Sequence, residues 1–206
     1  YCGITGENDT TTSGVIYFGG TNKATGNDFN TIDHCNIHEG NVTSRYMIYA
    51  SGSPGKFNDH ITISDNNIYN FYATNQTSAG IAVMKGNTDW NISKNSFYQT
   101  APRSAPSFFY GIQINDPNAD NFVIDSNYFG GTGPQATGSM MTISGNGPLR
   151  MIDAKLSSAT TSHITGNIFT NYKLDDLDIF SSAAIYIVSG RTVVSNNLVG
   201  TNYSTY

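Results

Sequence analysis

The chain repeats one short pattern of apolar and polar positions. An aliphatic residue is followed by two variable residues, then Asn or Cys, one variable residue and a second apolar residue. Successive Asn or Cys positions are 31, 29, 32, 40 and 29 residues apart, and self-similarity of this kind predicts a repeat architecture. The six copies are Ile32/Cys35/Ile37, Ile63/Asn66/Ile68, Ile92/Asn95/Phe97, Ile124/Asn127/Phe129, Ile164/Asn167/Phe169 and Val193/Asn196/Leu198.

A second apolar stretch follows each copy, so each repeat offers at least two strands. These stretches begin at Tyr46, Gly80, Gly111, Met140 and Ala184, and turns rich in Gly, Asn, Asp, Ser and Pro bound them. No long segment has an apolar period of 3.6 residues, so we expect few and short helices. A repeat of about 30 residues, all strand and turn, predicts one coil of a parallel β-helix.

Two of the repeats, at 61–68 and 90–97, resemble the coils of right-handed parallel β-helix proteins. Those proteins form the pectate-lyase-like superfamily, which includes polysaccharide lyases, glycoside hydrolases, phage tailspikes and surface adhesins. The resemblance covers nearly the whole chain. It implies an all-β fold, a single-stranded right-handed parallel β-helix (solenoid) of about six coils. It specifies no function, because many activities share the scaffold.

An internal ladder of Asn and Cys side chains follows from this fold. Stacked coils lie about 4.8 Å apart, so an inward Asn at a tight turn can bond to backbone and to the Asn of the next coil. Cys2 belongs to a half-copy 33 residues before Cys35, and the two would sit on adjacent coils, as a disulfide or as two buried thiols. The expected ladder residues are Cys2, Cys35, Asn66, Asn95, Asn127, Asn167 and Asn196.

Composition narrows the class of protein. Charged residues make up only 12% of the chain, about half the usual fraction, which suits a secreted or cell-surface β-solenoid. A net charge of −5 argues against a nucleic-acid partner, which needs a basic patch. No apolar run reaches 18 residues, so we expect no membrane span.

The chain is expected to form one β-helix domain, 1–206, cut from a longer protein. Its first repeat is incomplete, and no amphipathic helix precedes Cys2 to act as a lid. An open solenoid end exposes apolar core and unpaired strand edges. We therefore expect flanking domains or capping partners at both ends.

Charged residues beside the Asn turn are the first candidates for chemistry. The outward column reads His34, Asp65, Lys94, Ser126, Gly166 and Ser195, with Asp33 and Asp125 close by. Elimination on an acidic sugar needs a base, often Lys, and a cation such as Ca²⁺ to neutralise the carboxylate. The catalytic candidates are therefore Lys94 as the base, Asp65 and Asp125 as cation ligands, and His34. A solvated turn with surface ion pairs would explain the same residues.

The densest acidic group gives metal candidates, Asp175, Asp176 and Asp178, in the long connection 172–182. The pair Asp175 and Asp176 is similar to one element of the polygalacturonase-like pattern. The Gly-His-Gly and Arg-x-Lys elements of that pattern are missing, so its activity does not carry over. A Ca²⁺ site and a solvated acidic loop both remain open.

The repeat from Asn127 to Asn167 is about ten residues longer than its neighbours. We expect the excess near 145–158, as a loop or an extra strand. Insertions in solenoids lie on one face, often the binding face. This segment contributes Arg150, Asp153 and Lys155 as ligand-binding candidates.

Aromatic residues in turn regions give the remaining candidates, Tyr72, Tyr110 and Tyr172. Flat rings stack on sugar faces, and a shallow groove along a β-helix matches an extended glycan. The alternative is that these rings fill corners of the core.

Two function classes follow. The first is an extracellular or cell-surface β-helix module, a non-catalytic stalk or adhesin that presents loops for glycan or protein binding. The alternative is a polysaccharide lyase or glycoside hydrolase that acts on an extended, uronate-type glycan along the groove. The incomplete catalytic set favours the first, and Ca²⁺ is the one candidate cofactor.

Overall fold

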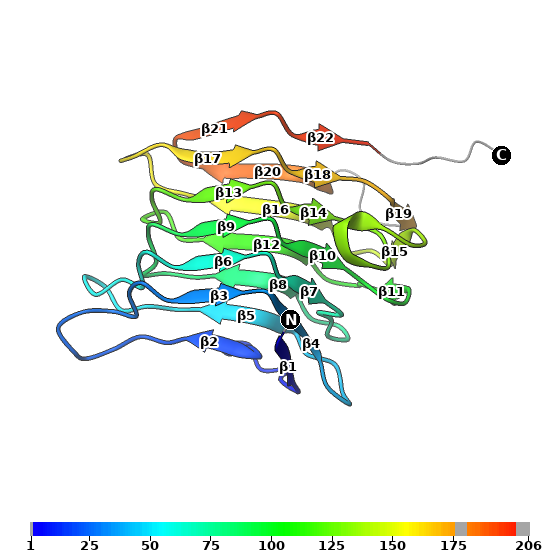
Figure 1. Cartoon of the computed structure of the whole chain (residues 1–206), viewed down its shortest axis with the longest axis horizontal. Coiled ribbons are helices and arrows are strands. Elements are labelled where there is room, and N and C mark those ends of the chain that lie inside the picture. Colours follow the sequence, from blue (N-terminus) through cyan, green and yellow to red (C-terminus); the bar gives the residue numbers. More distant parts are fainter. Residues whose placement is uncertain (1, 176–180, 201–206) are drawn as a thin grey trace.

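A computed structural model describes residues 2–175 and 181–200. The chain winds as an all-β parallel solenoid whose strands stack coil upon coil (Figure 1). Two of its parallel sheets lie in front in Figure 1, and a third lies behind them. Among the described residues, helical structure is limited to the 3₁₀ turn η1 (Pro134–Ala136), so none of their helices could cross a bilayer.

Four parallel sheets make up the described solenoid. Sheet A contains β1 (Cys2–Gly6), β4 (Cys35–Glu39), β7 (Asn67–Tyr69), β10 (Ser96–Tyr98), β14 (Tyr128–Phe129), β18 (Ile168–Phe169) and β22 (Leu198–Val199). Sheet B contains β2 (Ile16–Phe18), β5 (Tyr46–Ala50), β8 (Ser78–Val83), β12 (Phe109–Asn115), β16 (Leu149–Lys155) and β20 (Ala183–Ser189). Sheet C contains β3 (Thr31–Asp33), β6 (Thr62–Ser64), β9 (Asn91–Ser93), β13 (Val123–Asp125), β17 (Ser162–Thr165) and β21 (Thr192–Ser195). Sheet D contains β11 (Arg103–Ser104), β15 (Met141–Ser144) and β19 (Tyr172–Asp175).

The aliphatic and aromatic positions of the repeat fill the interior. Ile63 pairs in register with Ile92, and both are fully buried. The rings of Phe97, Phe129 and Phe169 form one internal stack with centroids 4.8 Å apart. That spacing equals the separation of neighbouring strands, so identical positions on successive coils can stack their rings face to face.

Two glycines in sheet B leave room for this stack. A Cβ atom on Gly80 would come within 2.7 Å of the Phe97 ring, and one on Gly111 within 2.7 Å of the Phe129 ring. These distances are shorter than any ordinary carbon contact, so a side chain would displace the stacked rings. The absence of a side chain at both positions therefore supports the aromatic core.

The predicted Asn ladder is present at the turn between sheets C and A. The Oδ1 atom of Asn95 accepts hydrogen bonds from Nδ2 and the backbone N–H of Asn66, at 2.9 and 3.0 Å. The same two bonds join Asn95 to Asn127 and Asn127 to Asn167. At the other end, the backbone N–H of Cys35 donates to Oδ1 of Asn66 at 2.8 Å. Because each side chain satisfies buried backbone groups, the ladder offsets the cost of a tight buried turn.

The cysteines lie on neighbouring strands as expected. Cys2 of β1 pairs in register with Cys35 of β4. Both are free thiols in this structure, with Cys35 buried and Cys2 exposed. Burial is the main cause that raises the pKa of the Cys35 thiol, which keeps this thiol neutral.

The ladder position predicted for Asn196 is wrong by one residue. Asn167 donates both its backbone N–H and its Nδ2 to Oδ1 of Asn197, each at 2.9 Å. Sheet C agrees, because Ile164 pairs with Val194. The last repeat contains two adjacent aliphatic residues and two adjacent Asn residues, so the sequence pattern fits at two offsets. The ladder, here called the inner column, consists of Cys35, Asn66, Asn95, Asn127, Asn167 and Asn197.

The insertion is also placed differently from the prediction. Phe97 pairs with Phe129, and Arg103 pairs with Ile143, so the additional residues lie between 129 and 143. The segment predicted at 145–158 instead contains β16, a regular strand of sheet B. The inserted segment contains η1 and packs over sheet A, where the backbone N–H of Gln135 donates to Oγ of Ser96 at 2.9 Å.

A second, shorter ladder was not predicted. Asn27 Nδ2 donates to Oδ1 of Asn58 at 2.9 Å, and Asn58 Nδ2 donates to Oδ1 of Asn87 at 3.0 Å. In the next coil Asp116 occupies this region and accepts the backbone N–H of Gly86 at 2.7 Å. The signal was in the sequence, because these Asn residues are 31 and 29 residues apart, the same spacings as in the inner column.

Candidate functional site

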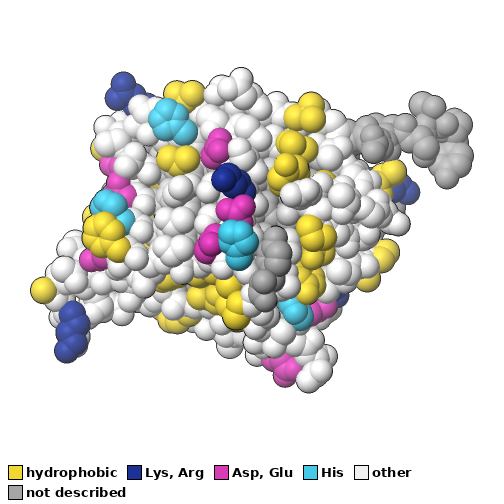
Figure 2. All heavy atoms as spheres, in the orientation of Figure 1, with side chains coloured by type: hydrophobic (Ala, Val, Ile, Leu, Met, Phe, Trp, Pro, Cys, Tyr) yellow, Lys and Arg dark blue, Asp and Glu magenta, His cyan; other side chains and the backbone are white. Residues whose placement is uncertain are grey.

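The turn between sheets C and A places one side chain of each coil outward. The residue before each inner-column residue has a positive φ, between 51° and 65°, and at this residue the chain bends from a strand of sheet C into a strand of sheet A. The neighbouring coils align these residues into an outer column on the face shown in Figure 2, where acidic, basic and His side chains gather. The column consists of His34, Asp65, Lys94, Ser126, Gly166 and Asn196, and Asn196 replaces the Ser195 expected from the sequence.

Three members of this region form a cluster. Ligand-type atoms of Asp33, His34 and Asp65 all lie within 4.8 Å of one another, and we call these residues the turn cluster. His34 Nδ1 lies 2.6 Å from Oδ2 of Asp33, and Oγ of Ser64 donates to Oδ1 of Asp33 at 2.6 Å. The hydrogen bond from Ser64, followed by the one from His34, lowers the pKa of Asp33, so its carboxylate stays ionised to more acidic pH.

Asp125 has different partners from Asp65. Its carboxylate accepts hydrogen bonds from Oγ of Ser126 at 2.8 Å and from Oγ1 of Thr165 at 2.6 Å. The cation pair predicted from Asp65 and Asp125 is thus divided between two groups, with Lys94 on the coil between them. The catalytic roles predicted for Lys94, Asp65, His34 and Asp125 stay predictions.

A second candidate surface is the outer face of sheet B. A cluster of buried residues lies there, separate from the interior core, and Met84 and Phe108 pack against it. The rings of Tyr46 and Tyr49 have centroids 5.3 Å apart, and those of Phe108 and Tyr110 are stacked at 5.6 Å. The aromatic face, as we call it, is built on Tyr46, Tyr49, Ala79, Ala82 and Tyr110.

A buried ion pair continues the aromatic face toward the last coils. Arg150 Nη1 lies 2.6 Å from Oδ2 of Asp153, with side chains only 11% and 7% exposed. The Arg150 guanidinium lies over the Tyr186 ring, 3.7 Å from its centroid, and 5.0 Å from the centroid of Phe108. Desolvation raises the pKa of Asp153, an effect that the hydrogen bond from Arg150 opposes.

Register brings three of the predicted ligand residues together. Tyr110 pairs with Arg150, and Gln113 with Asp153, on the neighbouring strands β12 and β16. Burial also raises the pKa of Tyr110 far above its ordinary value, so its hydroxyl stays protonated. The polar groups of this face therefore include the protonated hydroxyls of Tyr46, Tyr49 and Tyr110 and one ion pair.

Two other predicted ligand residues have different surroundings. Tyr72 donates its hydroxyl to the carbonyl of Ser104 at 2.9 Å, and its ring lies under Arg103. Lys155 ends β16 and pairs with Asn115, and its side chain is partly exposed.

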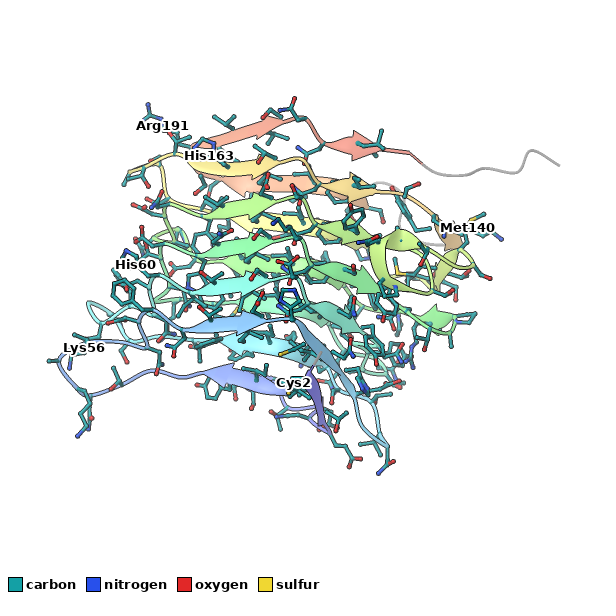
Figure 3. All side chains as sticks on the ribbon, viewed as in Figure 1. Cys2, Lys56, His60, Met140, His163 and Arg191 are labelled. Carbon is teal, nitrogen blue, oxygen red and sulfur yellow. The ribbon has the colours of Figure 1, made fainter. Side chains whose placement is uncertain are left out.

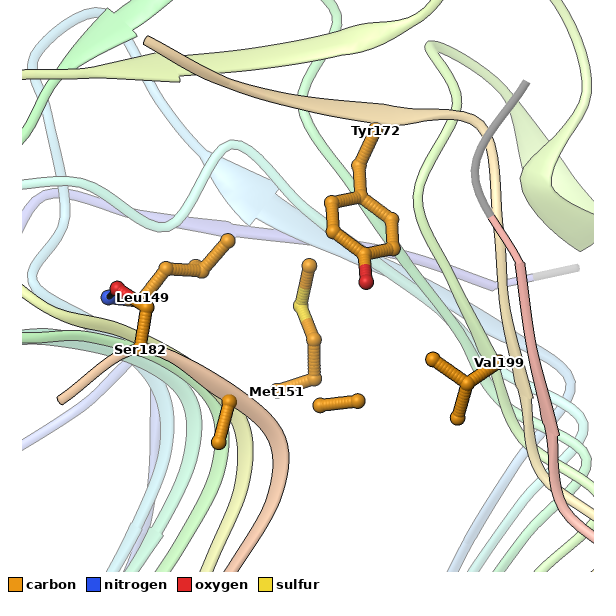
Figure 4. Close-up of a pocket in the computed structure, with 7 residues that line it drawn as sticks. Leu149, Met151, Tyr172, Ser182 and Val199 are labelled. Atoms are coloured by element: carbon orange, nitrogen blue, oxygen red, sulfur yellow. Dashed lines mark hydrogen bonds between the residues drawn. The ribbon is translucent and has the colours of Figure 1, made fainter. Parts of the chain in front are cut away.

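Tyr172 takes the core position that the sequence left open as the alternative to the surface. Its side chain is 9% exposed and lines a cavity of about 170 Å³ at the last coils, with Leu149, Met151 and Val199 (Figure 4). The cavity continues the apolar interior. The alternation of sheet D explains this, because Tyr172 pairs with Met141, which is also buried.

The acidic group predicted to bind metal is largely outside the described residues. Asp175 ends β19. Asp176 and Asp178 fall between 175 and 181, outside the described ranges. The Ca²⁺ site predicted there stays a prediction.

Sequence reasoning missed several residues of the aromatic face. Tyr17 pairs with Tyr49 on sheet B, and Tyr186 pairs with Asp153. An alignment of the sheet B stretches in the sequence would have placed these tyrosines on the same outward face. The stretches are apolar at nearly every position, however, so the sequence suggested that both of their faces are buried. Tyr17 and Tyr186 are 50% and 39% exposed, so they offer open ring surface.

The fold defines the class of protein, a parallel β-solenoid with buried Asn ladders. Comparison with known protein families, with curated proteins and with solved structures finds no match to this chain.

Proposed function

We propose that this chain is an extracellular or cell-surface module that binds a glycan, without turning it over, on the aromatic face of sheet B. We further propose that it belongs with the right-handed β-helices of the pectate-lyase-like superfamily. One observation carries the functional proposal. Aromatic rings from successive coils meet a buried Arg–Asp ion pair on the outer face of one sheet.

Aromatic residues give this face the chemistry of a sugar platform. The exposed rings of Tyr17 and Tyr186 lie at opposite ends of sheet B, and the closely packed tyrosines between them form a rigid floor. Flat rings offer apolar area to the faces of sugars while a few fixed polar groups set orientation. A linear glycan along this face would contact the exposed rings of Tyr17 and Tyr186, and the buried rings of Tyr46, Tyr49 and Tyr110 would support these contacts from below.

The polar groups favour binding over hydrolysis. Glycoside hydrolysis normally uses two carboxyl groups about 5 to 9.5 Å apart. Among the described outward positions of sheet B, Asp153 supplies the one carboxylate, and Arg150 is ion-paired to it. A paired carboxylate positions hydroxyl groups of a ligand without adding net charge to the face.

A glycan array that covers neutral and uronate oligosaccharides tests the proposal, followed by titration calorimetry on the best ligand. Tyr186→Ala removes an exposed ring above Arg150 and should weaken binding by about tenfold, in line with roughly 1 to 1.5 kcal/mol for an aromatic contact. Phe29→Ala is the matched control, because Phe29 is 75% exposed but stacks on His60, away from sheet B. An array without any bound glycan, or equal loss in both variants, would contradict the proposal.

A lyase remains the second candidate, favoured by one observation, the turn cluster on the coils next to Lys94. An absorbance assay for unsaturated products, on uronate polymers with and without Ca²⁺, separates the two functions. If the chain forms unsaturated products and Lys94→Ala abolishes this activity, the protein is a lyase and not a binding module.

A further inference from the structure

The turn cluster combines two carboxylates and one imidazole from two successive coils. The donor atoms of Asp33, His34 and Asp65 already lie within 4.8 Å of one another. Around a first-row cation, ligand bonds of about 2.0 to 2.2 Å bring donors closer than this. All three side chains reach solvent, so small rotations can close the remaining gap. From this juxtaposition we propose that Asp33, His34 and Asp65 bind one divalent transition-metal cation such as Zn²⁺.

The donor set decides the class of cation. Ca²⁺ and Mg²⁺ take oxygen ligands, whereas an imidazole nitrogen beside carboxylates suits zinc and its neighbours in the first transition row. Two carboxylates also supply the charge of a divalent ion. The site thus shares Asp65 with the predicted Asp65–Asp125 pair but differs from it in its other residues and in its metal.

The scaffold holds the ligands from both coils. Asp33 pairs in register with Ser64 on sheet C, and the His34 backbone N–H donates to the Ser64 carbonyl at 3.3 Å. The Asp65 backbone N–H donates in turn to the Ser93 carbonyl at 3.1 Å. Positive φ values of 51° and 54° direct His34 and Asp65 to the same side of the turn. The ligands therefore sit on fixed backbone.

Ser64 supports the site from behind. Its hydroxyl donates to Oδ1 of Asp33, while Oδ2 lies on the side of His34. A partner that fixes one carboxylate oxygen orients the other toward a metal, which is the usual role of groups behind metal ligands.

The chain contains an internal control. His60 Nδ1 lies 2.9 Å from Oδ1 of Asp59, and His60 also has a positive φ, 52°. Among the described residues, however, only the turn cluster brings three ligand atoms together. His60 lies at the opposite end of the sheet C strands from the turn cluster (Figure 3). A His–Asp pair of similar exposure without a third ligand should bind metal weakly or not at all.

Titration calorimetry with ZnCl₂, in a buffer that does not chelate zinc, tests the proposal on the whole chain. We expect one saturable site per chain, with a Kd in the micromolar range. His34→Ala and Asp65→Asn should each weaken binding at least tenfold, and His60→Ala should leave it unchanged. Cys2 lies next to the cluster, because its backbone N–H donates to the His34 carbonyl at 3.0 Å. Cys2→Ser should also leave zinc binding unchanged, and this result would show that the Cys2 thiol is not a ligand.

Thermal melts followed by circular dichroism give an independent readout. Zn²⁺ should raise the Tm of the natural chain and of His60→Ala, but not that of His34→Ala, whose Tm without metal shows whether it folds. The proposal is overturned by a lack of saturable binding, by equal affinity of His34→Ala, or by loss of binding in Cys2→Ser. Equal stabilisation by Ca²⁺ would overturn the assignment to a transition metal. Glycan binding on sheet B is measured separately, so either proposal can fail alone.

Discussion

The inner and outer columns of one turn occupy adjacent residues but obey different rules. The inner column is Asn at every coil after Cys35, and Asn66, Asn95, Asn127 and Asn167 are all buried. The outer column contains His, Asp, Lys, Ser, Gly and Asn in turn. Inside, the side chains of Asn95 and Asn127 each complete four hydrogen bonds in a fixed geometry, whereas outside only the positive φ must be met.

The difference teaches where a solenoid of this kind can carry function. The inner column fixes spacing and register, and few side chains other than Asn could replace its amides. The outer column is free to vary because solvent satisfies whatever stands there. Chemistry such as the turn cluster can therefore arise on the outer column without disturbing the stack.

The sharpest test of this contrast is Asn95→Ala against Lys94→Ala. Asn95 is fully buried and bonds to Asn66, Asn127 and the Ile63 carbonyl, so its loss leaves several buried groups unpaired. At about 1 to 3 kcal/mol for each such group, partly relieved by relaxation, we expect a loss of about 3 kcal/mol in the free energy of unfolding. Lys94→Ala should change it by less than about 0.5 kcal/mol. Urea unfolding measures both, and comparable losses would remove the distinction between the columns.

The last coil offers a smaller and more specific test. Asn197→Ala removes two hydrogen bonds to Asn167 and should cost about 1 to 2 kcal/mol, less than Asn95→Ala because this coil is more exposed. Asn196→Ala should cost less than Asn197→Ala, because in the outer column it affects only the positive φ, which Ala tolerates less well than Asn. The reverse order of the two losses in urea unfolding would restore the register predicted from the sequence.

The smallest expected effect concerns the titration of the outer face. Ser64→Ala removes the main cause of the lowered pKa of Asp33, which should move up toward 3.8. Because the folded-state pKa lies below the unfolded value, the stability from Asp33 is present above the unfolded pKa and is lost as pH falls through the folded pKa. In Ser64→Ala the folded pKa moves closer to the unfolded pKa, so this loss should be smaller and should be complete at a higher pH. An NMR titration of the carboxyl carbon measures the pKa of Asp33 in both proteins. An unchanged pKa would show that His34 alone lowers it.

Much of the fold was predictable because the repeated pattern shows which residues of successive coils lie next to each other. Ile63, Asn66 and Ile68 recur with constant offsets, and only stacked coils explain both the period and the alternation. The prediction failed where two offsets fit equally well, at Asn196 and Asn197. Only the pairing of neighbouring strands decides between such offsets.

The candidate sites were less accessible to sequence reasoning. The extra residues of the long repeat were assigned near Arg150, although Arg150 and Asp153 are a buried pair on a regular strand. For Tyr172 the sequence left a surface and a core position open, and the alternation of its strand turns the ring inward. Whether a side chain is buried or exposed depends on which face of its strand is covered. A strand of a few residues has too short an apolar pattern to show which face that is.

The ladder has a direction that bears on how such a protein can grow. Every Asn amide from Asn66 to Asn167 donates to the coil after it and receives from the coil before it. A single repeat copied into the middle of the chain would find matching partners above and below, with no new interface to evolve. Gain or loss of whole repeats is therefore the easiest route by which this architecture changes its length.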